Sequence, residues 1–169
     1  MNKIIYWRKA VEKQIIKTTL SEISPLIIGC FDDGLDVTLT VTGSSMQPLL
    51  KHNRDQVVLT KVQADSLKKG DVPLYIRRGG QYVLHRIVDV QQGTYTMLGD
   101  AQTNLEKGIK PDQVFAVAKG FYRKGRYINC QGWGYRRWVS LWWHLRRFRP
   151  HLLKAHYIFN RIFDREKPE

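Results

Sequence analysis

The sequence predicts a mainly β, α+β fold: a twisted antiparallel β-barrel or sandwich, with an N-terminal helix and C-terminal amphipathic helices. Three observations predict it. Short β-branched or alternating stretches recur between residues 35 and 128, separated by glycine-containing turns. Residues 3–31 have helical spacing, and residues 133–163 interleave aromatic side chains with arginine. With 169 residues, 43% of them hydrophobic, the chain can bury a core.

These patterns divide the chain into three parts. We expect an N-terminal helical segment over residues 1–34, a β-rich domain over 35–128, and basic aromatic helices over 129–169. Within the first part, Ser24-Pro25 is either a helix break or a new helix start, with Ser24 as the N-cap. Residues that follow helical steps of three and four before this point are Ile4, Trp7, Val11, Ile15 and Thr18.

Six stretches of the central part have the composition of strands. Their spacing resembles successive hairpins rather than alternating strands and helices, which excludes a doubly wound α/β fold. Pro73 lacks an N–H donor, so it belongs at the edge or the start of its strand. The predicted strands are 35–41, 56–60, 71–76, 82–90, 94–98 and 114–122.

The charge of the chain is concentrated near its C-terminus. The net charge is +13, and residues 119–169 contain 13 Lys and Arg against 3 Asp and Glu. Such asymmetry indicates an anionic partner. The two cysteines, Cys30 and Cys130, make neither a disulfide framework nor a zinc site by themselves. We expect no cofactor and no metal.

No apolar run approaches the roughly 20 residues that a transmembrane helix needs, and residues 1–10 do not resemble a secretory signal. The aromatic, arginine-rich helices instead predict peripheral association with an anionic membrane surface, with the cytoplasmic face as the candidate side. The alternatives are that their apolar face packs on the barrel, or that they bind another protein; no motif indicates nucleic acid. Candidate membrane-surface residues are Trp138, Trp142, Trp143, Arg146 and Arg147.

The stretch VTGSSMQPLL, residues 41–50, places two serines on a sharp corner. A serine hydroxyl becomes a nucleophile only with a base in reach and donors aimed at the developing oxyanion. Gly43 permits unusual backbone torsions, and Met46 can anchor the turn in the core. The stretch fits either an exposed nucleophile or an ordinary polar turn.

Two further motifs supply candidate partners. In YVLHRIV, residues 82–88, alternation places His85 on an apolar face, where it is either a core histidine or a base with a pKa near neutrality. In LGDAQTN, residues 98–104, Asp100 is either a turn residue or a carboxylate that orients the imidazole.

In this order, the motifs resemble the signal peptidase I branch of serine peptidases, which is related to LexA-type self-cleaving repressors. The resemblance covers about residues 35–123 and implies the twisted antiparallel barrel or sandwich of that family. The matching boxes are GSSMQPLL (43–50), KKGDVPLY (68–75), VLHRIV (83–88) and LGDAQTN (98–104).

The resemblance assigns roles to particular residues. Ser45, directly before Met, is the implied nucleophile. His85 stands where many bacterial members have lysine, as in the archaeal and endoplasmic-reticulum branch, so it is the implied general base. Asp100 is the expected carboxylate partner. Glu106 and Asn104 are the candidates for a further third member or orienter.

The resemblance also implies an oxyanion site and a substrate path. The Ser45 N–H is the expected oxyanion donor, on a turn that includes Gly43 and Ser44. The substrate would lie extended beside two strands, held by main-chain pairing. The candidate substrate-strand residues are Thr40, Thr42, Tyr82, Val83 and Leu84.

The predicted function is therefore a serine endopeptidase of the signal peptidase type, which cleaves leader or signal segments of peptides or proteins by a Ser–His mechanism. Two alternatives stay open. One is a LexA-like self-cleaving regulator, although residues 1–34 show no helix-turn-helix. The other is a non-catalytic membrane- or peptide-binding module on the same fold. The sequence gives no indication of the oligomeric state.

Overall fold

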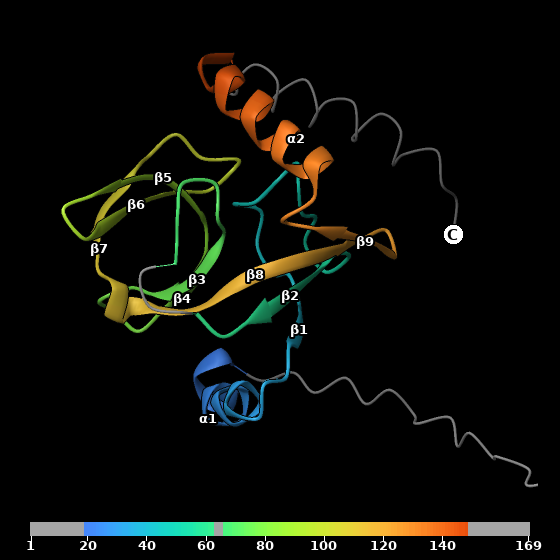
Figure 1. Ribbon diagram of the computed structural model, residues 1–169, viewed down its shortest axis with the longest axis vertical. Helices are drawn as coiled ribbons and strands as arrows, with labels where there is room; N and C mark the ends of the chain where they lie inside the picture. The colour runs from blue at the N-terminus through green and yellow to red at the C-terminus, as the bar shows by residue number, and fades with distance from the viewer. Residues whose placement is uncertain (1–18, 63–65, 149–169) are drawn as a thin grey trace, which may run out of the picture.

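The computed structural model describes residues 19–62 and 66–148 as a mainly β structure with a helix at each end (Figure 1). The helices are α1 (Leu20–Asp32) and α2 (Trp133–His144), with the short 3-10 helices η1 (Pro111–Gln113) and η2 (Leu145–Phe148). The strands are β1 (Val37–Thr40), β2 (Gln56–Thr60), β3 (Pro73–Ile76), β4 (Tyr82–Leu84), β5 (Arg86–Gln91), β6 (Thr94–Leu98), β7 (Glu106–Ile109), β8 (Val114–Arg123) and β9 (Arg126–Asn129).

The strands form two antiparallel sheets. The six-stranded sheet has the order β1-β2-β8-β3-β4, with β9 also paired to β8, and the three-stranded sheet has the order β5-β6-β7. Register shifts at Val58/Leu59 and Leu74/Tyr75 are typical of bulges, which bend and twist a sheet. The result is a curled half-barrel, which confirms the prediction of a β-rich α+β fold. Strands β1 and β4 are the edges of the larger sheet.

The predicted strand over 82–90 is in fact two strands in different sheets. The break falls at His85, so β4 completes the larger sheet and β5 begins the smaller one. Strands β7 and β9 were not predicted, because stretches such as Glu106–Ile109 lack β-branched alternation and gain their structure from pairing with a neighbour. Pro73 is the first residue of β3, as predicted.

Helix α1 begins later than the pattern over 3–31 suggested. Thr19 is its N-cap and forms a capping box with Glu22, while Pro25 lies inside the helix. The prediction of a helix start at Ser24 is therefore wrong. A proline cannot donate to the carbonyl four residues earlier, and here the Ser24 hydroxyl donates to the Ser21 carbonyl at 3.0 Å instead. The helical positions predicted before residue 19 lie outside the described residues.

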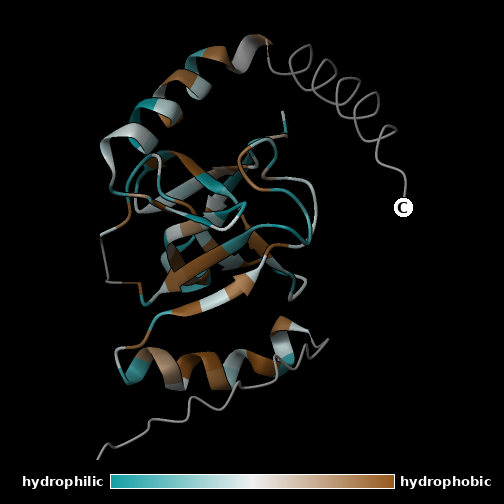
Figure 2. Ribbon diagram, turned by 90° about the vertical axis from the view of Figure 1, so that its right-hand side faces the viewer, coloured by the Kyte–Doolittle hydropathy of each residue, from teal (hydrophilic) through white to brown (hydrophobic). Residues whose placement is uncertain are grey.

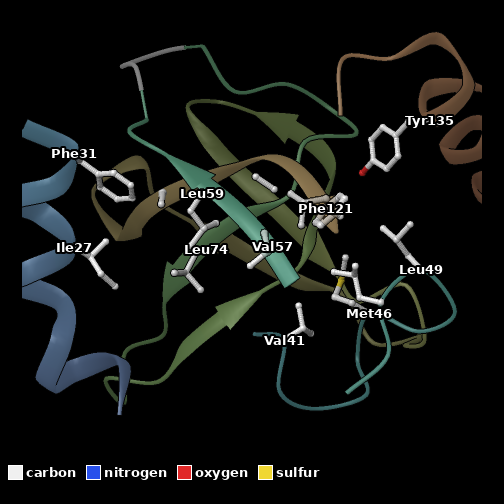
Figure 3. Packing of buried hydrophobic residues seen from close by; sticks show 14 residues of the cluster. Ile27, Phe31, Val41, Met46, Leu49, Val57, Leu59, Leu74, Phe121 and Tyr135 are labelled. Carbon is white, nitrogen blue, oxygen red and sulfur yellow. The ribbon is translucent and has the colours of Figure 1, made fainter. Parts of the chain in front are cut away.

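One hydrophobic cluster joins both helices and the Ser45 turn to the larger sheet (Figure 3). Its apolar side chains come from both helices, the Ser45 turn and the larger sheet. Each fully buried one contributes about 1.5–3 kcal/mol to folding. Figure 2 shows the same hydrophobic strands between the two helices. Labelled members are Ile27, Phe31, Val41, Met46, Leu49, Val57, Leu59, Leu74, Phe121 and Tyr135.

The aromatic face of α2 packs against the β structure rather than facing outward. Trp142 and Tyr135 are buried, and Trp138 stacks between them with ring centroids 5.7 Å and 6.5 Å away. Trp142 is therefore covered by the β structure, and the half-buried Trp138 packs against the same core, as the alternative of packing on the barrel predicts. The outward side presents Trp133 and Leu141, which are 74% and 59% exposed.

Trp143 is half-buried. The side chains of Arg146 and Arg147, and all of residues 149–169, lie outside the described part of the chain. Within the described part, neither helix has the length and apolar character that crossing a bilayer requires.

Candidate active site

Ser45 and His85, the candidate nucleophile and base from the sequence, line one small pocket of about 230 Å³. The pocket lies where the turn after β1 meets β4 and the joint between the two sheets. We call it the nucleophile pocket. Its lining residues are Val41, Thr42, Ser45, Met46, Arg77, Tyr82, Val83, Leu84, His85 and Gln102.

The two serines of the turn are not equivalent. Ser44 is exposed and does not line the nucleophile pocket, whereas Ser45 is half-buried and does. The next side chain, Met46, is buried in the core and anchors the turn to it. Gly43 has φ +86°, a left-handed conformation that favours glycine. The structure therefore makes Ser45 the candidate nucleophile and leaves Ser44 as a turn residue.

The loop that carries Ser45 is anchored by a buried carboxylate and a histidine. Asp55 accepts hydrogen bonds from the Arg54 guanidinium at 2.7 and 2.8 Å and from the Lys124 N–H at 3.2 Å. His52 Nδ1 accepts the Gly43 N–H at 2.9 Å. Because this N–H is already used, Gly43 is not an oxyanion donor.

A glycine allows the Gly99–Gln102 turn to approach Ser45 closely. The Ala101 N–H donates to the Ser45 carbonyl at 2.8 Å, and a Cβ at Gly99 would lie 2.7 Å from that same oxygen. Within residues 19–62 and 66–148, the Ser45 N–H donates no hydrogen bond. It is therefore available as the oxyanion donor that the resemblance implies.

His85 is an almost fully enclosed imidazole, 1% exposed. Burial lowers its pKa below the ordinary value of 6.5, although the negative charge of Glu106 partly opposes this effect. The ring is therefore neutral at neutral pH, which is the form that a general base needs. Its Nδ1 atom lies 3.2 Å from both Glu106 Oε1 and the Tyr75 hydroxyl.

Glu106 is held beside His85 by its own partners. The Arg77 guanidinium donates to both carboxylate oxygens, with the Nε–Oε2 distance 2.8 Å, and these bonds lower the pKa of Glu106. The Tyr75 hydroxyl adds a hydrogen bond that acts in the same direction. The Glu106 carboxylate is therefore ionised and can accept a hydrogen bond from a protonated His85 Nδ1.

Asp100, the expected partner of His85, pairs with Arg86 instead. The Arg86 guanidinium donates to the two Asp100 oxygens at 2.9 and 2.6 Å, and also to the Gly70 carbonyl and the Tyr135 hydroxyl. The reason is the strand break at His85: Arg86 begins β5 beside β6 and the Asp100 turn that follows β6, whereas His85 lies beside Tyr75 of β3 and Glu106 of β7. Of the two other candidates, Glu106 lies beside His85 Nδ1, whereas Asn104 is exposed and does not line the pocket.

Three further residues at the candidate site were not singled out from the sequence: Tyr75, Arg77 and Gln102. Gln102 lines the nucleophile pocket from the Gly99 turn. Tyr75 and Arg77 are two residues apart at the end of β3, and Tyr75 lies opposite Val83 in the register with β4. Alternation along β3 places both on one side, and this spacing was the signal that sequence reasoning had available.

An open groove adjoins the nucleophile pocket and lies between the two edges of the larger sheet. It is lined by the first residues of α1, by β1 and by β4, and the two cavities share Thr42, Arg77, Tyr82 and Val83. We call it the edge groove. Thr40 also lines it, and Leu84 lines the nucleophile pocket, so all the substrate-strand candidates lie along one connected surface.

The described residues contain no group of three His, Cys, Asp or Glu side chains placed to hold a metal ion. The two cysteines are free thiols, and burial raises the pKa of Cys130 to about 12. Comparison with known proteins finds no matching family model and no matching curated protein.

Proposed function

We propose that the protein is a serine endopeptidase of the signal peptidase type, with Ser45 as nucleophile, His85 as general base and Glu106 as the orienting carboxylate. One observation carries the proposal. Ser45 shares a small pocket with a buried, neutral histidine whose Nδ1 faces a carboxylate fixed by Arg77. This arrangement fits the roles of a nucleophile, a base and an orienter.

In the first half of the reaction, His85 takes the proton from the Ser45 hydroxyl as Oγ attacks the carbonyl carbon of the scissile amide. The ionised Glu106 carboxylate stabilises the resulting imidazolium, and the Ser45 N–H stabilises the tetrahedral oxyanion. The C–N bond then breaks, His85 gives its proton to the leaving amine, and an ester to Ser45 is formed.

In the second half, water attacks the ester carbonyl while His85 accepts a proton from it. The tetrahedral intermediate collapses, the C–Oγ bond breaks, and the proton returns from His85 to Ser45. The carboxyl product then leaves and the enzyme regains its first state. No cofactor takes part in this scheme.

The edge groove suits an extended peptide. Strands β1 and β4 each present an unpaired edge to it, so a substrate strand can pair with main-chain groups of both. The nucleophile pocket has a volume of only about 230 Å³. This volume favours small side chains next to the cleaved bond, which supports leader or signal segments as the substrate class.

The decisive experiment compares the two adjacent serines. Full-length protein should cleave a peptide with small residues before the scissile bond and should react covalently with a fluorophosphonate probe. Ser45→Ala should abolish both reactions while circular dichroism shows an unchanged fold, and His85→Ala should abolish turnover. Ser44→Ala is the matched control and should retain both. Activity of the Ser45→Ala protein equal to that of the wild type would contradict the mechanism.

The same samples test the two alternatives. A protein that binds the peptide without cleaving it, and whose Ser45 does not react with the probe, is a non-catalytic binding module. A LexA-like regulator would instead cut its own chain, which mass spectrometry of aged protein detects as two fragments in place of one intact mass.

We also propose peripheral contact with an anionic membrane through the outward stripe of α2. Trp133 and Leu141 are exposed on this side, and the Arg137 guanidinium lies 4.9 Å from the Trp133 ring centroid. Indole rings and guanidinium groups suit the headgroup interface. Flotation with phosphatidylglycerol vesicles should decrease in the double variant Trp133→Ser/Leu141→Ser. Val90→Ser, which changes an exposed apolar residue on β5, should leave it unchanged.

A further inference from the structure

A third cavity, of about 580 Å³, lies beneath α2 and shares no lining residue with the nucleophile pocket or the edge groove. This volume falls in the range of small-molecule sites, about 300–1,000 Å³. We call it the α2 cleft. Its walls are the turn before β3, the start of β5 and one side of α2. The lining residues are Lys68, Lys69, Gly70, Asp71, Arg86, Ile87, Cys130, Gln131, Tyr135, Arg136, Val139, Ser140, Trp142, Trp143 and His144.

Positive charge exceeds negative charge in this cleft. Arg86 is neutralised by Asp100, which leaves Lys68, Lys69 and Arg136 against the single lining carboxylate of Asp71. In residues 19–62 and 66–148, neither lysine ammonium has a carboxylate within 4.0 Å. The cleft therefore presents three cations to one carboxylate, that of Asp71, which attracts Lys68 and Arg136 electrostatically.

The cations stand on a fixed framework. The Lys68 N–H donates to Asp71 Oδ2 at 2.8 Å, and the Gly70 N–H donates to a β5 carbonyl at 2.9 Å, so the turn is tied to the sheet. The Lys69 ammonium lies 4.6 Å from the Trp143 ring centroid, which holds it over the cleft wall. A site prepared in this way loses less conformational entropy when an anion binds.

The third cation and the apolar wall come from α2. Arg136 donates one Nη to Gln131 Oε1 at 2.7 Å, which orients the guanidinium at the mouth of the cleft. A guanidinium matches phosphate oxygens in geometry, and charge-assisted bonds of this kind are the strong ones. Val139 and Trp143 provide apolar surface beside it.

We infer that the α2 cleft binds an organic phosphate, with the phosphate group among Lys68, Lys69 and Arg136 and its apolar body against Val139 and Trp143. The headgroup of an anionic phospholipid and a soluble phosphate ester share this chemistry. The inference goes beyond the proposed peptidase activity and does not depend on it, because no residue of the cleft takes part in the reaction.

Calorimetric titration of the full-length protein separates the two sources of phosphate. The probes are monomeric dihexanoyl phosphatidylglycerol, the zwitterionic dihexanoyl phosphatidylcholine, and glycerol 3-phosphate. Binding of the phosphatidylglycerol but not of the phosphatidylcholine identifies a lipid headgroup site. Comparable binding of glycerol 3-phosphate identifies a site for soluble esters. Either result supports the cleft, and binding of none of the three overturns it.

Matched charge variants test whether the cleft is the site. Lys68→Gln/Lys69→Gln should weaken binding at least about tenfold, which is roughly 1.4 kcal/mol. Lys107→Gln/Lys110→Gln removes the same formal charge from exposed positions outside the cleft and should leave affinity unchanged. Equal losses in the two variants would show diffuse attraction and overturn the proposal. Tighter binding of a single-stranded oligonucleotide through the same two lysines would overturn it in favour of nucleic acid.

The Ser45→Ala variant keeps the two proposals separate. It should bind the probes with unchanged affinity although it has lost peptidase activity. A wild-type protein that cleaves peptides but binds no phosphate would refute the cleft alone, and one that binds phosphate without cleaving would refute the peptidase alone.

Discussion

His85 and Arg86 are neighbours in the chain, and each meets a carboxylate of the β6–β7 region, yet the two pairs differ. The Arg86 and Asp100 side chains are 4% and 1% exposed, and their charges are matched by two hydrogen bonds. Glu106 is 25% exposed and faces a histidine that can gain or lose a proton. The Arg86–Asp100 pair is closed to solvent and its charges are fixed, which suits a structural role. The His85–Glu106 pair is partly open to solvent and its histidine can titrate, which suits a chemical role.

Among changes to the two carboxylates, the largest expected effect on activity comes from Glu106→Gln. The change removes the carboxylate that stabilises the imidazolium, so kcat should fall by about 10³-fold or more. Stability should change little, because Glu106 is partly exposed. Steady-state kinetics and thermal melting measure the two quantities. If kcat stays within a few-fold of wild type, Glu106 is not the orienting group and the distinction between the pairs fails.

Asp100→Asn should show the opposite balance. It leaves the Arg86 charge buried without its counter-ion, so the free energy of unfolding should fall by about 3–5 kcal/mol. Urea unfolding monitored by circular dichroism measures this loss. Below the unfolding transition, kcat of the folded protein should stay within about tenfold of wild type. A loss of kcat as large as that of Glu106→Gln, at unchanged stability, would return the orienting role to Asp100.

The pH dependence of activity tests the chemical role of the His85–Glu106 pair. Since burial lowers the pKa of His85, the acid limb of kcat/KM should lie below pH 6.5. The negative charge of Glu106 favours the protonated ring, so Glu106→Gln should move this limb to still lower pH. A limb above pH 7 in the wild type would contradict a buried, neutral base.

Stability should follow the same titration. The folded state holds a proton on His85 less tightly than the unfolded chain does. The contribution of His85 to stability is therefore present above pH 6.5 and is lost as the pH falls from 6.5 through the lowered pKa. His85→Gln cannot titrate, so it should remove this component from the stability profile measured by urea unfolding.

The smallest expected effect comes from Tyr135→Phe on the structural side. The change removes the hydroxyl that accepts the Arg86 Nη1–H at 2.8 Å, which should cost about 1 kcal/mol of stability. Activity should not change, because Asp100 still neutralises Arg86. Tyr127→Phe, at an exposed position that lines neither the edge groove nor the nucleophile pocket, is the control and should alter neither quantity. A marked fall in kcat for Tyr135→Phe alone would show that the two pairs are coupled.

Some of this arrangement could be predicted from local sequence. Strands β2 and β6 have the predicted bounds, and the turn at Ser45 and the apolar surroundings of His85 follow from short-range patterns. The choice between Asp100 and Glu106 could not be predicted in this way. It depends on the strand break at His85 and on the pairing of β7 with β6, and neither has a local signature.

The helix α2 shows the same limit. The aromatic spacing predicts an amphipathic helix, and Trp138 and Trp142 do stack on one side of α2, since periodicity is a property of the segment itself. It does not say what covers that face. Here the neighbouring β structure does, and the buried Trp142 indole donates to the Asp100 carbonyl at 3.2 Å. The sequence therefore predicted an apolar face and favoured a membrane surface for it, with packing on the barrel as the alternative.

The position of His85 between two sheets has a consequence for the newly made chain. A ribosome delivers Ser45 first, then His85, and Glu106 only after the β5–β6 hairpin has emerged. On the proposed mechanism, a nascent chain that carries the nucleophile and the base still lacks its orienting carboxylate until β7 pairs with β6. On that mechanism, peptidase activity would arise only late in synthesis, after β7 has been made and has paired with β6. The growing polypeptide would therefore not be exposed to an active peptidase site of its own.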